Sequence, residues 1–342
     1  MDADLDLQAD REGDAIPVLL TDADLRPLFS EDVLGLVDAA EGALRENTPP
    51  RHDNSFIRVP LGPEGVAVAA NSSDSLAFGA VLHSYVRGAD SRPMTDADGL
   101  LMDVTLLFDV ADGNLEAILC TREYETVRIP VQTAVGCRYL APSGSRVLGV
   151  MGSSVQARGH IPILLKTLPT IEEVRIYSPA REHREGLARD LDGSLEADVR
   201  AVETARAAIE EADVLLAAAN SDAATFEPGW VKPGGLVASI SRRQLPTELA
   251  LSARVIPSNL EGYEYTVGGG RRAADHAGRH DAEWRSVRPA GSLLDVVRGD
   301  IRARERDQDT ILFLLTGIPA IGAALARHVL EWAAERGLGT RF

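Results

Sequence analysis

The feature that most constrains the fold is a strand, a tight turn and a helix over Arg146–Ala157 (RVLGVMGSSVQA). An apolar strand runs into three small residues, and a helical pattern begins directly after them. This arrangement is typical of the phosphate-binding turn of a dinucleotide-binding domain, where the first N–H groups of the helix face a pyrophosphate. We therefore predict a nucleotide cofactor whose phosphates are bound by Gly152, Ser153, Ser154, Val155 and Gln156.

Strand and helix patterns alternate after this turn. We predict strands over 146–150, 173–177, 199–202, 213–218, 236–240 and, as the last strand, 254–256, with helices between most of them, and we expect helical structure across 310–336, interrupted at Gly317–Pro319. Such alternation predicts a parallel sheet with right-handed crossovers. Before it, residues 56–120 contain several short apolar runs separated by turn signals, which indicate a sheet-rich N-terminal domain. A long helix over 125–140 is expected to join the two parts.

Composition excludes several classes of partner. The 342-residue chain has 35 basic and 52 acidic residues, a formal net charge of −17. A groove for nucleic acid, or a surface for anionic membranes, needs clustered basic residues, so we expect neither partner. Cys120 and Cys137 show no metal-ligand spacing, and we predict no metal site. No apolar stretch reaches the about 20 residues of a membrane span, and no signal peptide is recognised, so we expect a cytoplasmic protein.

The end of the second predicted strand bears on the cofactor. NAD sites usually have Asp or Glu there to accept hydrogen bonds from the ribose hydroxyls, whereas this chain has Ser178, followed by Arg181 and Arg184. Serine and arginine suit a 2′-phosphate, which a carboxylate would repel. We therefore expect NADP(H), with NAD(H) as the alternative. The other interpretation is that both arginines lie on a solvated helix face.

Several stretches, in this order, resemble the ornithine cyclodeaminase/mu-crystallin family. They are FDVADGNLEAIL, VRIPVQTAVGCRYLA, LGVMGSSVQAR, EEADVLLAAANSD and GWVKPGGLVASIS. The resemblance implies an α/β fold, with a Rossmann-type parallel sheet domain and a sheet-rich N-terminal substrate and dimerisation domain completed by the C-terminal helix. We expect a flexible acidic leader at 1–15, the substrate domain at 16–125 with 311–342, and the nucleotide domain at 126–310. A homodimer is also implied.

The resemblance also implies candidate catalytic residues. Arg128 matches the family arginine that holds the substrate carboxylate, and Arg51 matches a second one, with Arg58 as its rival. The family lysine after the glycine of FGAVLHSYV is replaced by Val81. His83 lies two residues further, on the same face of the predicted strand, and is a candidate proton donor.

Two further positions bear on the chemistry. Asn220, in the stretch EEADVLLAAANSD, is a candidate cofactor-binding residue. The aspartate of the cyclodeaminases falls on Arg242 or Arg243, and a positive charge there cannot accept a proton. We therefore predict an NAD(P)H-dependent oxidoreductase acting at the α-carbon of a small carboxylate-bearing imino, keto or amino acid. The alternatives are a deaminating lyase and a binding protein that has lost catalysis. An arginine here also suits a second anionic group on the substrate.

Overall fold

The computed structural model of the chain describes residues 16–46, 56–59, 66–71, 78–83, 86–87, 93–94, 103–109, 113–121, 123–268 and 283–342. The acidic leader that we predict at 1–15 lies outside these residues. Within the described ranges, no helix combines the length and the apolar character needed to cross a membrane. The same ranges contain no group of three or more His, Cys, Asp and Glu residues placed to hold a metal ion.

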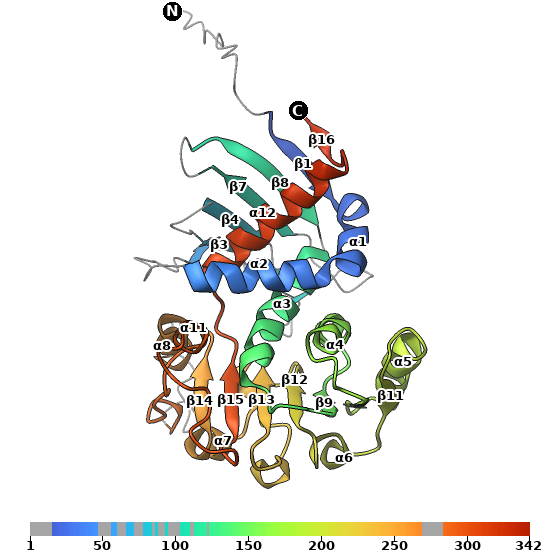
Figure 1. Ribbon diagram of the computed structural model, residues 1–342, viewed down its shortest axis with the longest axis vertical. Helices are drawn as coiled ribbons and strands as arrows, with labels where there is room; N and C mark the ends of the chain where they lie inside the picture. The colour runs from blue at the N-terminus through green and yellow to red at the C-terminus, as the bar shows by residue number, and fades with distance from the viewer. Residues whose placement is uncertain are drawn as a thin grey trace, which may run out of the picture.

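The part of the chain that follows the phosphate turn folds around a seven-stranded parallel sheet (Figure 1). Its lateral order is β11-β10-β9-β12-β13-β15-β14, and each pair of neighbours is parallel. The strands are β9 (Val147–Met151), β10 (Glu173–Tyr177), β11 (Asp198–Ala201), β12 (Val214–Ala217), β13 (Leu236–Ser239), β14 (Arg254–Pro257) and β15 (Ile311–Leu314). The strand order reverses between β9 and β12, and a sheet of this kind binds its ligand at the carboxyl ends of the strands beside such a reversal.

Both faces of this sheet are covered by helices, which explains why its central strands are continuously apolar. One face, with Leu148 and Phe313, packs in a core with α3 (Glu123–Leu140), α4 (Val155–Thr167) and α5 (Arg181–Leu191). The opposite face, with Leu215 and Leu312, packs with α6 (Ala205–Ile209), α7 (Thr247–Ser252) and α8 (Leu260–Gly268). The shorter elements here are η1 (Pro228–Trp230), η2 (Arg242–Gln244) and α11 (Leu293–Arg298).

A second seven-stranded sheet has the order β16-β1-β8-β7-β4-β3-β2. Its strands are β1 (Val18–Thr21), β2 (Phe56–Val59), β3 (Val66–Asn71), β4 (Phe78–His83), β7 (Asp103–Phe108), β8 (Leu115–Thr121) and β16 (Thr340–Arg341). All pairs are antiparallel except β1 with β8. A separate small pair joins β5 (Val86–Arg87) and β6 (Pro93–Met94). Helices α1 (Asp22–Glu31), α2 (Val33–Glu46) and α12 (Pro319–Glu335) pack together, and α12 contacts β3, β4 and β7.

The two sheets face each other across the carboxyl edge of the parallel sheet (Figure 1). Strand β15 ends at Leu314, and after four residues the chain continues as α12, which packs on the N-terminal sheet. The carboxyl ends of the parallel strands therefore point toward the N-terminal sheet. The predicted fold class is confirmed. The domain boundaries stay a prediction.

One element differs from the sequence-based expectation. We expected helical structure across 310–336, but Ile311–Leu314 forms strand β15, fully buried between β13 and β14, and the helix begins only at Pro319. A four-residue apolar run that is buried on both faces has no period of two, so its sequence does not distinguish it from the start of a buried helix. Strand β14 lies at the edge of the sheet, but along the chain the last strand of this sheet is β15.

Candidate functional site

The phosphate turn lies at the carboxyl end of β9, beside the reversal of strand order. Gly152 has φ +122°, and a Cβ atom built on it would lie 2.5 Å from the carbonyl oxygen of Ala218. Any side chain would therefore collide with the backbone that follows β12, and only glycine avoids both the collision and the unfavourable φ. The turn brings the ends of β9 and β12 into close backbone contact.

Helix α4 starts from this turn with its first N–H groups directed to the carboxyl edge. Ser154 is the N-cap residue, is exposed, and its side chain makes no capping hydrogen bond. An uncapped helix N-terminus leaves N–H donors for an anion, and the helix dipole favours negative charge there. Nearby, the side-chain oxygen Oε1 of Gln156 is buried, with no hydrogen-bond partner among the described residues. The uncapped N–H donors thus fit a pyrophosphate, whereas the Gln156 oxygen, an acceptor, would need a hydrogen-bond donor; a serine stands where the second glycine is usual.

At the end of β10, Ser178 is buried and its hydroxyl lies next to the turn. The hydroxyl of Ser153 donates to that of Ser178 at 2.8 Å. Arg184 is also buried; it donates to the carbonyl oxygen of Ser178 at 3.0 Å and pairs with Glu203 at 2.9 Å. Its role in the structure is to hold the backbone after β10. Arg184 is therefore not available to bind a 2′-phosphate of the nucleotide.

Arg181, at the first position of α5, is exposed. Its guanidinium pairs with Glu185 at 2.6 Å and lies 4.0 Å from Glu203. Ion pairs at such exposure contribute little to stability, about 0–1 kcal/mol, so another anion can compete for this side chain. Arg181 thus lies on a solvated helix face, as the other interpretation predicts. Because it follows Ser178 closely, it stays a candidate to bind a 2′-phosphate.

The loop after β12 is held by a residue that sequence reasoning missed. Gln244 in η2 is completely buried; its Nε2 donates to the carbonyl oxygen of Ala217 at 2.9 Å, and its Oε1 accepts from the N–H of Ala219 at 2.8 Å. Both bonds fix the backbone that leads to Asn220, which is itself exposed. The contact spans 27 residues, and nothing local in the sequence marks this glutamine among its charged neighbours.

The two arginines at the end of β13 have different surroundings. Arg243 is exposed and pairs with Asp222 at 2.7 Å. Arg242 is half-buried, and its guanidinium carbon lies 5.9 Å from the centre of the Trp284 ring, within the range of a cation–π contact. Neither position supplies a carboxylate.

Arg128 lies in the second turn of α3, and α3 runs antiparallel to the strands. Contacts near the C-terminal end of α3 show this direction. Arg304, in the segment before β15, donates to the carbonyl oxygen of Leu140. Gly136 packs on the ring of Phe313 within β15. From Leu140 back to Arg128 the helix rises about 18 Å, which exceeds the length of β15. The partly exposed Arg128 therefore stands at the carboxyl edge, the same edge as the phosphate turn.

The other catalytic candidates are in the N-terminal sheet. Arg51 lies outside the described residues. His83 is the last residue of β4, opposite Asp103 of β7, and Val81 pairs with Thr105 in the same strands. The side chains of β4 are outside the described part of the structure, as is that of Arg58 in β2. The role of His83 stays a prediction.

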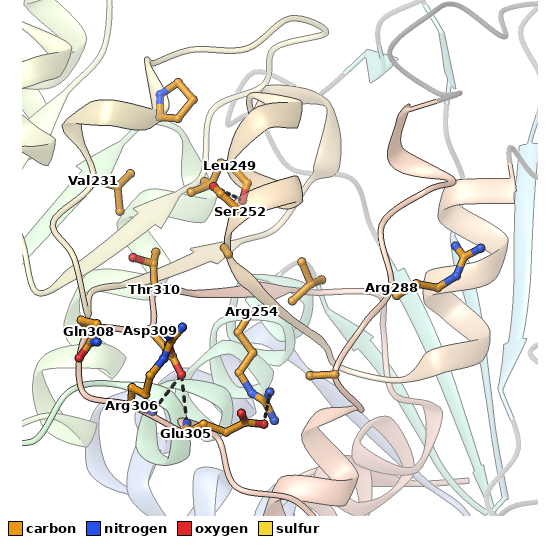
Figure 2. Close-up of a pocket in the computed structure, with 14 residues that line it drawn as sticks. Val231, Leu249, Ser252, Arg254, Arg288, Glu305, Arg306, Gln308, Asp309 and Thr310 are labelled. Atoms are coloured by element: carbon orange, nitrogen blue, oxygen red, sulfur yellow. Dashed lines mark hydrogen bonds and ion pairs between the residues drawn. The ribbon is translucent and has the colours of Figure 1, made fainter.

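A cavity of about 510 Å³ lies elsewhere, at the amino ends of β14 and β15 (Figure 2). Arg254, the first residue of β14, pairs with Glu305 at 2.9 Å, and Arg306 pairs with Asp309 at 2.8 Å. The two carboxylates in its wall are thus both paired with arginines, and Arg288 lines the cavity as a further arginine. Because the phosphate turn and Arg128 lie at the opposite edge of the sheet, this cavity is not part of the candidate site.

Comparisons with known proteins identify the family and the fold of the chain. The sequence profile of the ornithine cyclodeaminase/mu-crystallin family matches residues 71–337. The chain is 27% identical over 300 residues to Delta(1)-pyrroline-2-carboxylate reductase of Paracoccus denitrificans, covering 85% of this chain and 91% of that protein. It is 30% identical over 153 residues to ketimine reductase mu-crystallin of Rattus norvegicus, covering 43% of this chain and 47% of that protein.

A solved structure has the same fold. Delta(1)-pyrroline-2-carboxylate reductase of Thermococcus litoralis, in complex with NADH and L-proline, gives a TM-score of 0.78 at 20% identity, covering 95% of this chain and 100% of that chain. The three relatives named here are reductases, the class of enzyme that we predict from the sequence. From the profile match, which covers most of the sequence, we conclude that the chain belongs to the ornithine cyclodeaminase/mu-crystallin family.

Proposed function

We propose that this chain is an NAD(P)H-dependent reductase of a small carboxylate-bearing imino or keto acid. The observation that carries the proposal is the position of Arg128 at the carboxyl edge of the parallel sheet, the edge that also holds the uncapped start of α4. A pyrophosphate at α4 and a carboxylate at Arg128 would together fix a cofactor and a substrate at one edge. Orientation of this kind is a large part of the catalysis of a two-substrate reaction.

Three residues of this chain are proposed to act on the substrate. When bound, the reduced nicotinamide supplies the hydride that is added to the α-carbon of the substrate. Arg128 would bind the substrate carboxylate through two parallel N–H donors, with Arg51 as a second contact. The new amine or alcohol needs one proton, for which His83 or a water molecule is the candidate donor.

The end of β13 favours a reductase over a deaminating lyase. A lyase must first remove a proton from the substrate amine, which requires a base, and this position offers Arg242 and Arg243. Guanidinium groups stay protonated and cannot act as that base. Reduction of an imine needs no base there. A second anionic group on the substrate, near Arg242, is compatible with the same arrangement.

NADP(H) is the cofactor that we propose, and NAD(H) the alternative. Ser178 presents a hydroxyl where a carboxylate would repel a 2′-phosphate, and Arg181 lies just beyond it, with the half-buried Glu185 and the exposed Glu203 as its carboxylate neighbours. Asn220 is proposed to contact the nucleotide beside the turn. We also propose that the protein is a homodimer, which light scattering after gel filtration tests.

The test is NADPH oxidation with a cyclic imino acid such as Δ1-pyrroline-2-carboxylate, and with pyruvate plus ammonium, each repeated with NADH. We expect turnover that falls about a hundredfold or more in Arg128→Lys, because lysine cannot provide the bidentate contact. NADPH affinity, measured by fluorescence, should be unchanged. The matched control is Arg158→Lys, an exposed arginine of α4 paired with Asp190.

Three results would contradict the proposal in different ways. Nucleotide binding without any turnover would indicate a binding protein that has lost catalysis. Ammonia release with catalytic NAD⁺ and no net change in NADH would indicate the lyase. No binding of either nucleotide would exclude both enzymes.

A further inference from the structure

His160 is completely buried in the second turn of α4, facing α3. Its Nδ1 lies 2.6 Å from the carbonyl oxygen of Gln156, and its Nε2 lies 3.0 Å from the hydroxyl of Thr133 in α3. A carbonyl oxygen only accepts, so Nδ1 carries the proton and donates. Nε2 is then an acceptor, and the Thr133 hydroxyl, which also lies 3.2 Å from the carbonyl oxygen of Ile129, donates to Nε2 at the shorter distance. Burial lowers the pKa of His160 to about 4, so this neutral, fully bonded form is the one present near neutral pH.

The two partners of His160 belong to the two helices that form the candidate site. Gln156 is the second residue of α4 and follows the phosphate turn directly. Thr133 lies five positions after Arg128 in α3. The imidazole therefore connects the helix that begins at the cofactor phosphates with the helix that carries the substrate arginine.

The packing of the two helices explains why a directional bond matters here. At Gly159, a Cβ atom would lie 2.4 Å from the carbonyl oxygen of Thr126, so the two backbones touch. At this contact the glycine has no side chain that could fix the register of the two helices, so a directional bond beside it adds a constraint that the contact itself lacks. The bond between His160 and Thr133 is a side-chain hydrogen bond that joins α3 to α4 beside this contact.

We propose that His160 is a positioning residue that fixes the register of α3 on α4, and with it the placement of Arg128 relative to the phosphate turn. The inference rests on the proposed function, because it concerns how that site is held. It assigns to His160 no contact with cofactor or substrate. Loss of the link should therefore affect the alignment of the two ligands more than the binding of the nucleotide.

The experiment compares Thr133→Val, His160→Phe, His160→Gln and the double variant T133V/H160F in the full chain. We expect kcat to fall about tenfold in T133V and H160F, since small displacements of reacting groups are costly, while the Kd for NADPH stays within about twofold of the original value. H160Q, whose amide can accept from Thr133, should recover part of kcat. The double variant should be no slower than H160F, because both changes remove one link.

The control is Thr167→Val, which removes a hydroxyl that donates to the carbonyl oxygen of Ile163 at 2.8 Å within α4. Its kcat should be unchanged. The proposal is overturned if the folded H160F and T133V variants keep kcat, if their Kd for NADPH rises as much as kcat falls, or if their effects add in the double variant.

A failure of the proposed function would be recognised separately, as NADPH binding without turnover in the original chain. In that case amide hydrogen exchange replaces kcat. NADPH should slow exchange in both α4 and the first turns of α3, and in T133V only in α4. Equal protection of α3 in both proteins would refute the link.

Discussion

The hydroxyl of Ser153, in the phosphate turn after β9, donates a 2.8 Å hydrogen bond to the hydroxyl of Ser178 at the end of β10. Two adjacent strands of the parallel sheet thus end in a pair of neutral hydroxyls. In a dinucleotide-binding sheet, the end of this second strand is where the adenosine ribose is recognised. The pair therefore places no negative charge at the position that distinguishes a 2′-hydroxyl from a 2′-phosphate.

Ser178→Asp is expected to reverse the preference for the nucleotide. The new carboxylate would repel a 2′-phosphate and accept hydrogen bonds from the ribose hydroxyls of NADH. We expect the Kd for NADPH to rise at least about tenfold, equivalent to about 1.4 kcal/mol, and the Kd for NADH to fall. Fluorescence titration of both nucleotides measures this change. Ser194→Asp, at the far end of α5, adds the same charge away from the carboxyl edge; an equal shift in both variants would contradict the assignment.

Gly152→Ala should damage the turn more than glycine replacement does elsewhere. The variant combines a φ of +122° with a Cβ placed 2.5 Å from the carbonyl oxygen of Ala218. We expect a loss of stability of about 1–3 kcal/mol and a Kd for NADPH raised more than about tenfold. Gly193→Ala is the control, because it has φ +72° with open space around its Cβ position. If the two variants melt alike and both bind NADPH normally, the close approach at Gly152 is unimportant.

Gln244→Leu should loosen the loop that leads to Asn220. The variant leaves the N–H of Ala219 without its present partner, and it removes one of the two hydrogen bonds of the Ala217 carbonyl oxygen, which also accepts from the N–H of Ile240 at 3.2 Å. An unpaired buried polar group costs about 1–3 kcal/mol, so the melting temperature should fall and nucleotide affinity with it. The exposed Gln308 offers the control substitution Gln308→Leu. An unchanged melting temperature in Gln244→Leu would show that water or a rearranged loop replaces both bonds.

The sequence was sufficient to predict those parts of the site that are formed by residues close together along the chain. The strand, the glycine and the helix of the phosphate turn are contiguous, so the pattern predicts them together, and Glu123–Leu140 is apolar enough to predict α3 almost to its ends. Family membership is confirmed for the same reason, since these motifs follow one another along the chain. The assignments of cofactor and substrate contacts to individual residues stay predictions.

What the sequence did not predict depends on contacts between distant segments. The bond from Gln244 to the backbone of Ala217 and the pair of Arg184 with Glu203 exist only once the strands are side by side. Arg184 is an instructive case, because its position after Ser178 resembles that of a phosphate ligand. Burial shows instead that it stabilises the backbone. The insertion of β15 between β13 and β14 is likewise a property of the sheet and not of the four residues that form it.

The stability of the fold should depend on pH through His160. Its pKa is lowered from 6.5 to about 4, mainly by burial, so the unfolded chain binds a proton at a pH where the folded chain does not. Stability is then complete above about pH 6.5 and decreases as pH falls toward about 4. The full shift of about 2.5 units corresponds to roughly 3 kcal/mol.

Urea unfolding of the original chain and of His160→Gln between about pH 5 and 6.5 measures this contribution. Glutamine does not titrate, so the variant should have a flatter dependence of unfolding free energy on pH in that window. The pKa of Glu41 is also lowered, through its hydrogen bonds with Tyr139 and Arg138 acting against desolvation. That carboxyl contributes stability that is lost only below its ordinary value of 4.5, so the chosen window separates the two groups. Parallel pH curves for both proteins would mean that His160 is protonated equally in the folded and unfolded states.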